Sequence, residues 1–377
     1  MKKFATAFIA LGAVGALALS GCSSDDNSDN ETPAASASAS GDASAPAAAG
    51  FAADATIGVA LPQKTSENWV LAESLFNDGL KAAGFKPIVQ FANSGVPEQQ
   101  NQISAMTEQG AKVIVVGAID GSQLGTQLDA AKQSGATVIA YDRLLKNTAS
   151  VDQYIAFDNF KVGVLQGQAL LEGLGKLKGA APYNIELVAG SPDDANATPF
   201  FNGAMSILQP KIDDGTLKVV SGQTKFEQVA TQGWKAENVQ KRFDTIMSAN
   251  YSGGTELQGV LSPNDTLARG VLTSVKQAGQ TAVPVITGQD SEVESVKLIM
   301  QGIQYSTIYK DTRELVAETI KAIQAYQKGE QPEINDTKSY DNGVKIVPSY
   351  LLDPKIVTKE NAAEVYAGDP TLEPLTK

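Results

Sequence analysis

The feature that most constrains this chain is a repeated alternation of short apolar runs with segments of helical periodicity. Runs such as "TIGVAL", "KVIVVG" and "TVIAYD" each precede a helix-length stretch, and the scheme occurs twice along the sequence. Strands that alternate with helices in this way form parallel sheets with helices on both faces. The pattern therefore predicts an α/β protein with two doubly wound lobes.

The N-terminal residues predict an export signal. Two lysines precede an apolar run that ends in "LSGC", and small residues before a cysteine are similar to a bacterial lipobox, in which the cysteine is lipidated. We expect residues 1–22 to be a signal peptide with Cys22 as the lipidation site. A transmembrane anchor, or an ordinary signal with a chance cysteine, is the alternative. Residues 23–53, rich in Ser, Ala and Pro, predict a disordered tether.

Composition excludes several classes of function. The net charge is −12 and no basic run occurs, which argues against a nucleic-acid partner. The chain has no histidine, so His-dependent triads and HExxH metal sites are excluded. The folded part contains neither GxxxxGK[ST] nor GxGxxG, which argues against nucleotide binding. We expect no cofactor and no metal, and the single cysteine rules out an intramolecular disulfide.

Polar side chains gather where the predicted strands end, and ligands of open parallel sheets bind beyond the carboxyl ends of strands. These residues are Asp120, Asp142, Arg143, Asp158, Asn159, Asp193, Asp194, Asn264, Asp265, Gln289, Asp290 and Lys310. An acid at such a position can instead cap the following helix, and this alternative stays open above all for Asp158 and Asp265. Capping does not explain Arg143 or Lys310.

Such a set of side chains suits a neutral polyol, because a hydroxyl can donate to a carboxylate while accepting from a guanidinium or ammonium group. Arg143 offers a planar fork that spans two acceptors, and we expect the adjacent Asp142 to orient it. The two tryptophans, Trp69 and Trp234, follow predicted strands in different halves of the chain. Their rings can pack on the C–H faces of a sugar, and ordinary packing at a helix start is the alternative.

Several longer stretches carry a resemblance to a known family. In the same order along the chain, "VIAYDRLLKN", "YIAFDNFKVGVLQ", "NIELVAGSPDDANA" and "VITGQDSEVESVK" are similar to bacterial sugar-binding proteins of ABC transporters. The resemblance is specifically to the branch of xylose-binding and multiple-sugar-binding proteins, and it spans Thr56 to about Lys359. It implies the periplasmic-binding-protein fold of type I, in which a three-segment hinge joins two α/β lobes with parallel sheets.

The resemblance also implies where the lobes begin and end. The hinge crossings are expected near Asp158, near Lys310–Asp311 and near Val344–Pro348. The N-terminal lobe would then comprise residues 54–158 and 311–345. The C-terminal lobe would comprise residues 159–310 and 346–377.

Site residues follow from the same resemblance. The implied sugar ligands are Asn68, Trp69, Asp142, Arg143, Asn196, Trp234, Asn264, Asp290 and Lys310. The chain departs from the family at Asn68, where relatives often have arginine, and we expect the nearby Lys64 to compensate with its charge. This departure leaves the identity of the sugar open.

The implied function is the extracytoplasmic binding component of a monosaccharide ABC importer. It would hold an aldose of the xylose, glucose, galactose or arabinose type in the interlobe cleft by hinge closure. The implied partners are the sugar and a membrane permease, and the chain is expected to be a monomer that lipidated Cys22 anchors to the outer face of the cell membrane.

Other functions use related features. A receptor that presents a sugar or a small signalling molecule to chemotaxis or two-component sensing stays open, because it would share the site. An enzyme using Asp193 and Asp194 is disfavoured, since carboxylates that cleave a glycosidic bond need a fixed separation across it. A transcription regulator is disfavoured because a signal and lipobox occupy the place of its DNA-binding helices.

Overall fold

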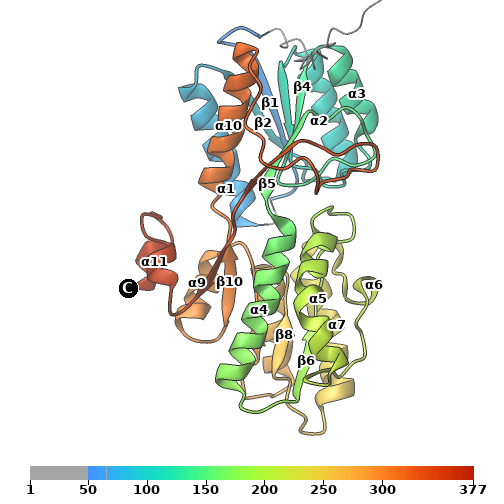
Figure 1. The fold of residues 1–377 in the computed structure, drawn as a ribbon, viewed down its shortest axis with the longest axis vertical. Coiled ribbons are helices and arrows are strands. Elements are labelled where there is room, and N and C mark those ends of the chain that lie inside the picture. The colour runs from blue at the N-terminus through green and yellow to red at the C-terminus, as the bar shows by residue number, and fades with distance from the viewer. Residues whose placement is uncertain (1–49, 65) are drawn as a thin grey trace, which may run out of the picture. The chain divides into compact units, whose positions relative to one another are not determined.

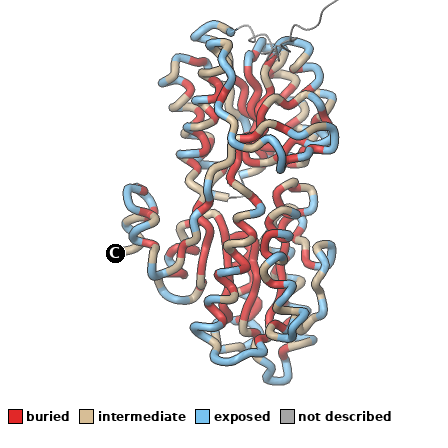
Figure 2. Tube along the Cα trace, viewed as in Figure 1, coloured by how far each residue is buried: buried red, intermediate tan, exposed pale blue. Residues whose placement is uncertain are grey.

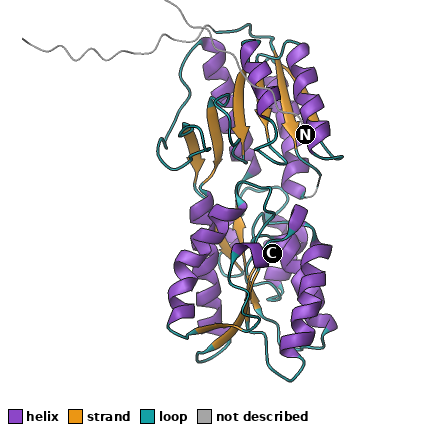
Figure 3. Ribbon diagram, turned by 90° about the vertical axis from the view of Figure 1, so that its right-hand side faces the viewer, coloured by secondary structure: helices purple, strands orange, loops and turns teal. Residues whose placement is uncertain are grey.

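Two parallel sheets form the framework of the computed structural model (Figure 1). The first sheet has six strands in the order β11-β5-β4-β3-β1-β2, and the second has four in the order β7-β6-β8-β9. Neighbouring strands are parallel throughout both sheets. Helices cover both faces of each sheet (Figure 3). The predicted fold class, two doubly wound α/β lobes, is confirmed.

The first lobe is built around the six-stranded sheet. Its elements are β1 (Thr56–Leu61), α1 (Glu67–Ala82), β2 (Lys86–Phe91), α2 (Val96–Glu108), β3 (Val113–Val116), α3 (Gly125–Gln133), β4 (Thr137–Tyr141), β5 (Gln153–Phe157), α10 (Thr312–Lys328) and β11 (Ser349–Leu352). The apolar residues of β3, β4 and β5 are buried, as their unbroken apolar runs predict. Helices α2 and α3 pack on one face of the sheet, while α1 and α10 pack on the other.

The second lobe is built around the four-stranded sheet. Its elements are α4 (Asn159–Leu177), β6 (Tyr183–Leu187), α5 (Ala197–Asp213), β7 (Leu217–Val219), α6 (Phe226–Val229), η1 (Gln232–Trp234), α7 (Ala236–Ile246), η2 (Met247–Tyr251), β8 (Gly259–Leu261), α8 (Asp265–Gln277), β9 (Val285–Ile286) and α9 (Val293–Met300). Helices α4 and α5 cover one face, and α7 and α8 the other. Figure 2 shows that the buried residues concentrate in the interior of both lobes.

A small antiparallel pair completes the second lobe. Strand β10 (Ser306–Tyr309) pairs with β12 (Lys355–Thr358), and α11 (Ala362–Val365) and η3 (Glu373–Thr376) follow. Tyr309 and Arg313 both contact Asp369, which ties this C-terminal segment to the start of α10. The run "QYSTIY", which contains β10, precedes a helix as the strands of the parallel sheets do, but β10 lies outside the four-stranded sheet.

Three segments pass between the lobes. They lie between β5 and α4, between β10 and α10, and between β11 and β12. The third crossing was expected near Val344–Pro348, and this prediction is wrong because β11 joins the first sheet in parallel with β5. The run "SYLL" fills the edge of that sheet, so the chain leaves the first lobe only after Leu352. We propose lobe limits of 50–158 plus 311–352 and 159–310 plus 353–377.

The structure describes residues 50–64 and 66–377, which belong to one compact unit that begins at Pro46. The predicted signal peptide, Cys22 and residues 23–49 of the predicted tether lie outside these residues. The tether was predicted to extend to residue 53, but the folded part already includes Phe51. The Phe51 backbone N–H donates to the Gln327 carbonyl at 3.0 Å, and its ring packs on Phe85. None of the described helices has the length and apolarity needed to cross a bilayer.

Candidate functional site

A cavity with an empty volume of about 450 Å³ lies between the two lobes, beyond the carboxyl ends of their strands. The cavity is lined by Ser66, Asn68, Trp69, Asp142, Arg143, Asp194, Asn196, Phe200, Trp234, Asn264, Thr266, Gln289, Asp290 and Lys310. Both lobes contribute, so the cavity exists only while the lobes are close together.

Nine of the ten ligand residues expected from the sequence line this cavity. Lys64 does not. Its ammonium group pairs with Glu73 on α1 at 3.0 Å, lies over the Phe91 ring, and is 46% exposed. The expected compensation for Asn68 by Lys64 is therefore not supported by the geometry, because an acidic neighbour on α1 holds the lysine outside.

Five lining residues were not among the predicted ligands: Ser66, Asp194, Phe200, Thr266 and Gln289. Asp194 and Gln289 follow strands and were visible as strand-end polar groups. Phe200 lies in the first turn of α5 and Thr266 in the first turn of α8, where helix-start signals alone do not show that a side chain faces a cavity.

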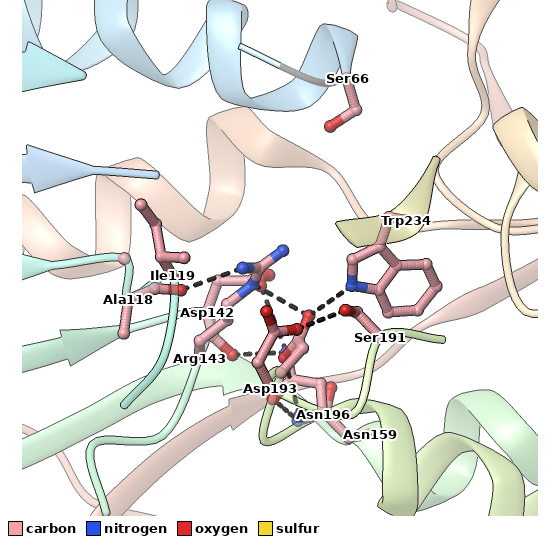
Figure 4. Close-up of polar contacts among 12 residues, drawn as sticks. Ser66, Ala118, Ile119, Asp142, Arg143, Asn159, Ser191, Asp193, Asn196 and Trp234 are labelled. Atoms are coloured by element: carbon pink, nitrogen blue, oxygen red, sulfur yellow. Dashed lines mark hydrogen bonds and ion pairs between the residues drawn. The ribbon is translucent and has the colours of Figure 1, made fainter. Parts of the chain in front are cut away.

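Arg143 pairs with a residue of the other lobe. Its Nε lies 3.0 Å from Oδ2 of Asp194, and its Nη1 donates to the Ala118 carbonyl at 3.0 Å (Figure 4). Its Nη2 makes no hydrogen bond with any described residue. The prediction that Asp142 orients the guanidinium is wrong, because Asp142 has a left-handed backbone (φ 60°) and the two adjacent side chains meet different partners.

Asp194 is the acceptor at the centre of this side of the cavity. Besides Arg143, its carboxylate accepts from the Trp234 indole N–H at 3.0 Å and from the Asn196 backbone N–H at 2.9 Å. Burial raises the pKa of Asp194, and the Arg143 charge and the Asn196 hydrogen bond oppose this rise. The carboxylate is thereby fixed in place with three donors around it.

A second charged group lies at the other side of the cavity. The Lys310 ammonium is 3.2 Å from Asp290 and 3.9 Å from Asp142, and its side chain is almost fully buried. Burial alone would lower the pKa of Lys310, but the carboxylates of Asp290 and Asp142 outweigh it and raise the pKa above its ordinary value. Lys310 therefore stays cationic between two acceptors.

The backbone is unusual at three lining residues. Asp142, Trp234 and Asp290 have φ angles of 60°, 56° and 91°, in the left-handed region that residues other than glycine rarely adopt. Such conformations cost of order 1–3 kcal/mol each and persist only where the surrounding structure enforces them. At Asp142 and Asp290 the chain turns sharply after a strand, and at Trp234 it turns between α6 and α7, and each turn presents its side chain to the cavity.

The two tryptophans come from opposite lobes. Trp69 in α1 is buried and packs edge-on against Tyr141, with the Arg143 guanidinium 5.4 Å from its ring centre. Trp234 lies in the η1 turn ahead of α7, against the backbone of Gly190, where an added Cβ would meet the ring at 2.1 Å. Both rings belong to apolar clusters and also line the cavity, so the packing alternative and ligand contact are compatible.

Helix caps account for some of the strand-end polar residues. Asp158 caps α4 by accepting from the Lys161 N–H, and Asn264 caps α8 by accepting from the Leu267 N–H. The Nδ2 of Asn264 has no described partner, so its donor is available at the cavity. Asp265 is not a cap: it is buried and accepts from the Glu292 backbone N–H, Gln304 and Thr307.

Gln289 is a lining residue with an unsatisfied group. Its side chain is 2% exposed, and its Nε2 donates to the Pro263 carbonyl at 3.0 Å. Its Oε1 is buried and has no hydrogen-bond partner among the described residues. A buried amide oxygen without a partner costs about 1–3 kcal/mol, so it is a candidate acceptor for a ligand hydroxyl.

Residues 57–331 match the model of the periplasmic binding protein domain. The chain belongs to the periplasmic binding protein family. It is 47% identical over 323 residues to the multiple sugar-binding periplasmic receptor ChvE of Rhizobium radiobacter, covering 84% of this chain and 91% of that protein. It is 34% identical over 322 residues to the D-xylose-binding periplasmic protein of Escherichia coli, covering 85% and 92% of the two chains.

Solved structures of this family have the same fold. An ABC transporter solute-binding protein of Clostridium phytofermentans, solved with bound β-D-glucose, superposes with a TM-score of 0.81 at 41% identity. The match covers 85% of this chain and all of that protein. The fold is therefore that of the type I periplasmic binding proteins. Members of the family are extracytoplasmic substrate-binding proteins and not enzymes.

Proposed function

We propose that this protein binds one monosaccharide in the interlobe cavity and delivers it to an ABC permease. The observation that carries the proposal is the composition of the cavity wall, which combines two tryptophans from opposite lobes with charged donors and acceptors. The names of the multiple-sugar-binding and xylose-binding relatives, and the glucose bound by the Clostridium protein, support an aldose as the ligand.

The polar groups divide into donors and acceptors that fit a ring of hydroxyls. The donors without described partners are Nη2 of Arg143 and the amide nitrogens of Asn68 and Asn264. The acceptors are the carboxylates of Asp142 and Asp290, with Lys310 between them. A sugar hydroxyl can bridge a donor and an acceptor of this kind, and charge-assisted bonds are the stronger ones.

The rings of Trp69 and Trp234 supply the apolar contact. A pyranose has C–H faces that pack on aromatic rings, and the rings here approach from different lobes. Contact with both rings is complete only when the lobes are together. A sugar would therefore bind the closed arrangement more tightly than an open one, and this difference drives hinge closure.

The cellular setting is part of the proposal. The "LSGC" sequence supports lipidation of Cys22, which would anchor a monomeric binding protein to the outer face of the cell membrane beside its permease. Detergent phase partition tests this point. The full-length protein expressed in a bacterial host should enter the detergent phase, and the Cys22→Ala variant should remain in the aqueous phase. Equal partition of the two would contradict lipidation.

Isothermal titration of residues 46–377, refolded to remove any co-purified sugar, tests the binding function directly. D-Xylose, D-glucose, D-galactose and L-arabinose would be titrated in turn. One-to-one binding of at least one of them is expected. If a well-folded protein binds none, the monosaccharide assignment is wrong and a small signalling molecule becomes the ligand to test.

A sensing role would use the same site, and the multiple-sugar-binding relative is called a receptor. Transport and sensing are separated by deleting the gene and measuring uptake of labelled sugar. Lost uptake supports the importer, whereas normal uptake with a lost transcriptional or chemotactic response supports the sensor.

A further inference from the structure

A ring of buried hydrogen bonds connects the two lobes beside the cavity. The Tyr154 hydroxyl in β5 donates to the Asp142 carbonyl at 2.6 Å. Nδ2 of Asn159, the first residue of α4, donates to the Tyr154 hydroxyl and to Oδ1 of Asn196, both at 2.9 Å. Asn196 closes the ring, because its Nδ2 donates to the Asp142 carbonyl at 2.9 Å. Figure 4 shows Asn159, Asn196 and Asp142 gathered at this point.

The ring has members in both lobes. Asp142 and Tyr154 belong to the first sheet and its loops, whereas Asn159 and Asn196 stand at the N-termini of α4 and α5. The Tyr154–Asn159 and Asn196–Asp142 bonds therefore cross from one lobe to the other. Each of the four residues is less than 9% exposed, and buried polar groups are stable only while they are paired. Separating the lobes would break the Asn196–Asp142 bond.

Neighbouring contacts fix the ring in place. Helices α4 and α5 touch backbone to backbone: a Cβ on Gly163 would lie 1.9 Å from the Phe200 carbonyl, and one on Gly203 would lie 2.1 Å from the Phe160 carbonyl. This close crossing sets Asn159 beside Asn196.

Two further contacts act on the first-lobe side of the ring. The ring of Tyr340 packs edge-on against Tyr154 at 4.8 Å, and its hydroxyl accepts from the Asn159 backbone N–H. The left-handed backbone of Asp142 turns the chain sharply just where its carbonyl meets two donors from the ring.

The ring differs from the ligand groups in one respect. Tyr154 and Asn159 do not line the cavity, and both ends of the Asn196 amide already bond protein atoms. A sugar inside the cavity therefore gains little from a direct contact with these three side chains. Their bonds contribute equally to closure around any ligand that fits.

We propose that Tyr154, Asn159 and Asn196 form a closure latch, which stabilises the closed arrangement of the lobes and slows sugar release without selecting the sugar. The inference rests on the proposed function, and it revises the role of Asn196 from sugar ligand to positioning residue. The latch acts on the closed state, so it lengthens the residence time of the sugar and leaves the encounter step unchanged.

Stopped-flow fluorescence of the tryptophans tests the latch on residues 46–377 with D-glucose and D-xylose. The Tyr154→Phe variant loses only the hydroxyl that joins Asp142 to Asn159. The dissociation rate constant should rise roughly 5- to 30-fold, as expected for one or two buried hydrogen bonds. The association rate constant should be unchanged, and the ratio of the two sugar affinities should equal that of the wild type.

Tyr251→Phe is the matched control. Tyr251 is also buried and donates its hydroxyl to Glu186 at 2.9 Å, but this bond lies within the second lobe. It should leave both sugar rate constants unchanged. The Asn159→Leu variant and the double variant Tyr154→Phe/Asn159→Leu would also be measured. The double variant should release sugar no more than about twofold faster than the faster of the two single variants, because the effects of substitutions within one hydrogen-bond network are not additive.

Two results separate this inference from the proposed function. If the wild type and the control bind sugar and Tyr154→Phe releases it at the wild-type rate, the latch is refuted while the binding function stands. If the wild type binds neither sugar, small-angle scattering of the sugar-free proteins tests the latch by itself. A larger radius of gyration for Tyr154→Phe than for Tyr251→Phe supports the latch, and equal radii refute it.

Discussion

Replacing Arg143 distinguishes a sugar ligand from a structural ion pair. The guanidinium makes two polar contacts with the protein, to Asp194 and to the Ala118 carbonyl, and its Nη2 has no described partner. If Nη2 donates to a sugar hydroxyl, Arg143→Met removes a hydrogen bond from a charged donor. Such a bond contributes about 1.5–3 kcal/mol, so the dissociation constant should rise about 10- to 150-fold.

A second variant separates the loss of a sugar contact from the loss of the ion pair with Asp194. Arg143→Met also leaves the Asp194 carboxylate buried without its cation, which by itself destabilises the closed site. In Arg143→Met/Asp194→Asn both charges are absent, and the single amide oxygen at position 194 can keep one of the two donors, the Trp234 indole N–H or the Asn196 N–H, which meet different carboxylate oxygens in the wild type. Thermal unfolding should therefore recover toward the wild-type midpoint, whereas sugar affinity should stay low.

Sugar affinity would be measured by titration calorimetry, and stability by thermal unfolding, for the wild type, Arg143→Met and Arg143→Met/Asp194→Asn. Recovery of both stability and affinity in the double variant would refute the reasoning, because Arg143 would then act only as the partner of Asp194. Low affinity with recovered stability assigns Arg143 to the sugar.

Three further changes test other parts of the structure. Gln289→Leu removes the unpaired Oε1, so sugar affinity should fall roughly three- to tenfold by calorimetry while the thermal midpoint does not fall; unchanged affinity would exclude Gln289 as an acceptor. Glu67→Gln weakens the interlobe contact of its carboxylate with the Val293 N–H at the start of α9 (3.0 Å), so sugar release should become roughly two- to fivefold faster at low salt and approach the wild-type rate at high salt. In Asp369→Asn the C-terminal segment loses its ion pair with Arg313. Burial raises the pKa of Asp369, but Arg313 and two backbone N–H groups outweigh it and hold the pKa below its ordinary value. This stabilisation is present above the unfolded pKa and is lost as pH falls through the folded one. The variant should therefore be less stable by about 1–2 kcal/mol at pH 7, and the difference should shrink as pH falls below the ordinary aspartate pKa of 3.8. A difference that does not shrink on acidification would contradict the assignment.

The fold was predictable because its signal is repeated. Each apolar run with a following helix is weak evidence alone, but the same order twice along the chain specifies two parallel sheets. The third crossing was missed because "SYLL" carries no information about which sheet it joins. Strand pairing at an edge is decided by which neighbour has free backbone groups, and here that neighbour was β5.

The strand-end groups of the cavity wall were predictable because polar side chains at the carboxyl ends of parallel strands meet at one edge, whereas Asn68 and Asn196 followed from the family resemblance. The pairing inside the site was not predictable. Adjacency in sequence suggested that Asp142 orients Arg143, but a single left-handed residue sends the two side chains to Asp194 and Lys310 instead. Lys64 was predicted to reach the site because it is close to Asn68 in the sequence. Its ion-pair partner Glu73 lies on α1, and the sequence does not show that this carboxylate and the lysine come together.

Asp142 belongs both to the cavity wall and to the hydrogen-bonded ring that joins the lobes. Its carboxylate faces Lys310 in the cavity, while its carbonyl accepts from Tyr154 and Asn196 in the latch. Both contacts depend on the left-handed backbone of Asp142, because it directs the side chain and the carbonyl of this residue to different partners. Under the proposed function, a sugar that fixes the carboxylate would also fix the carbonyl that the latch needs, so that sugar binding would be coupled to closure through this one residue.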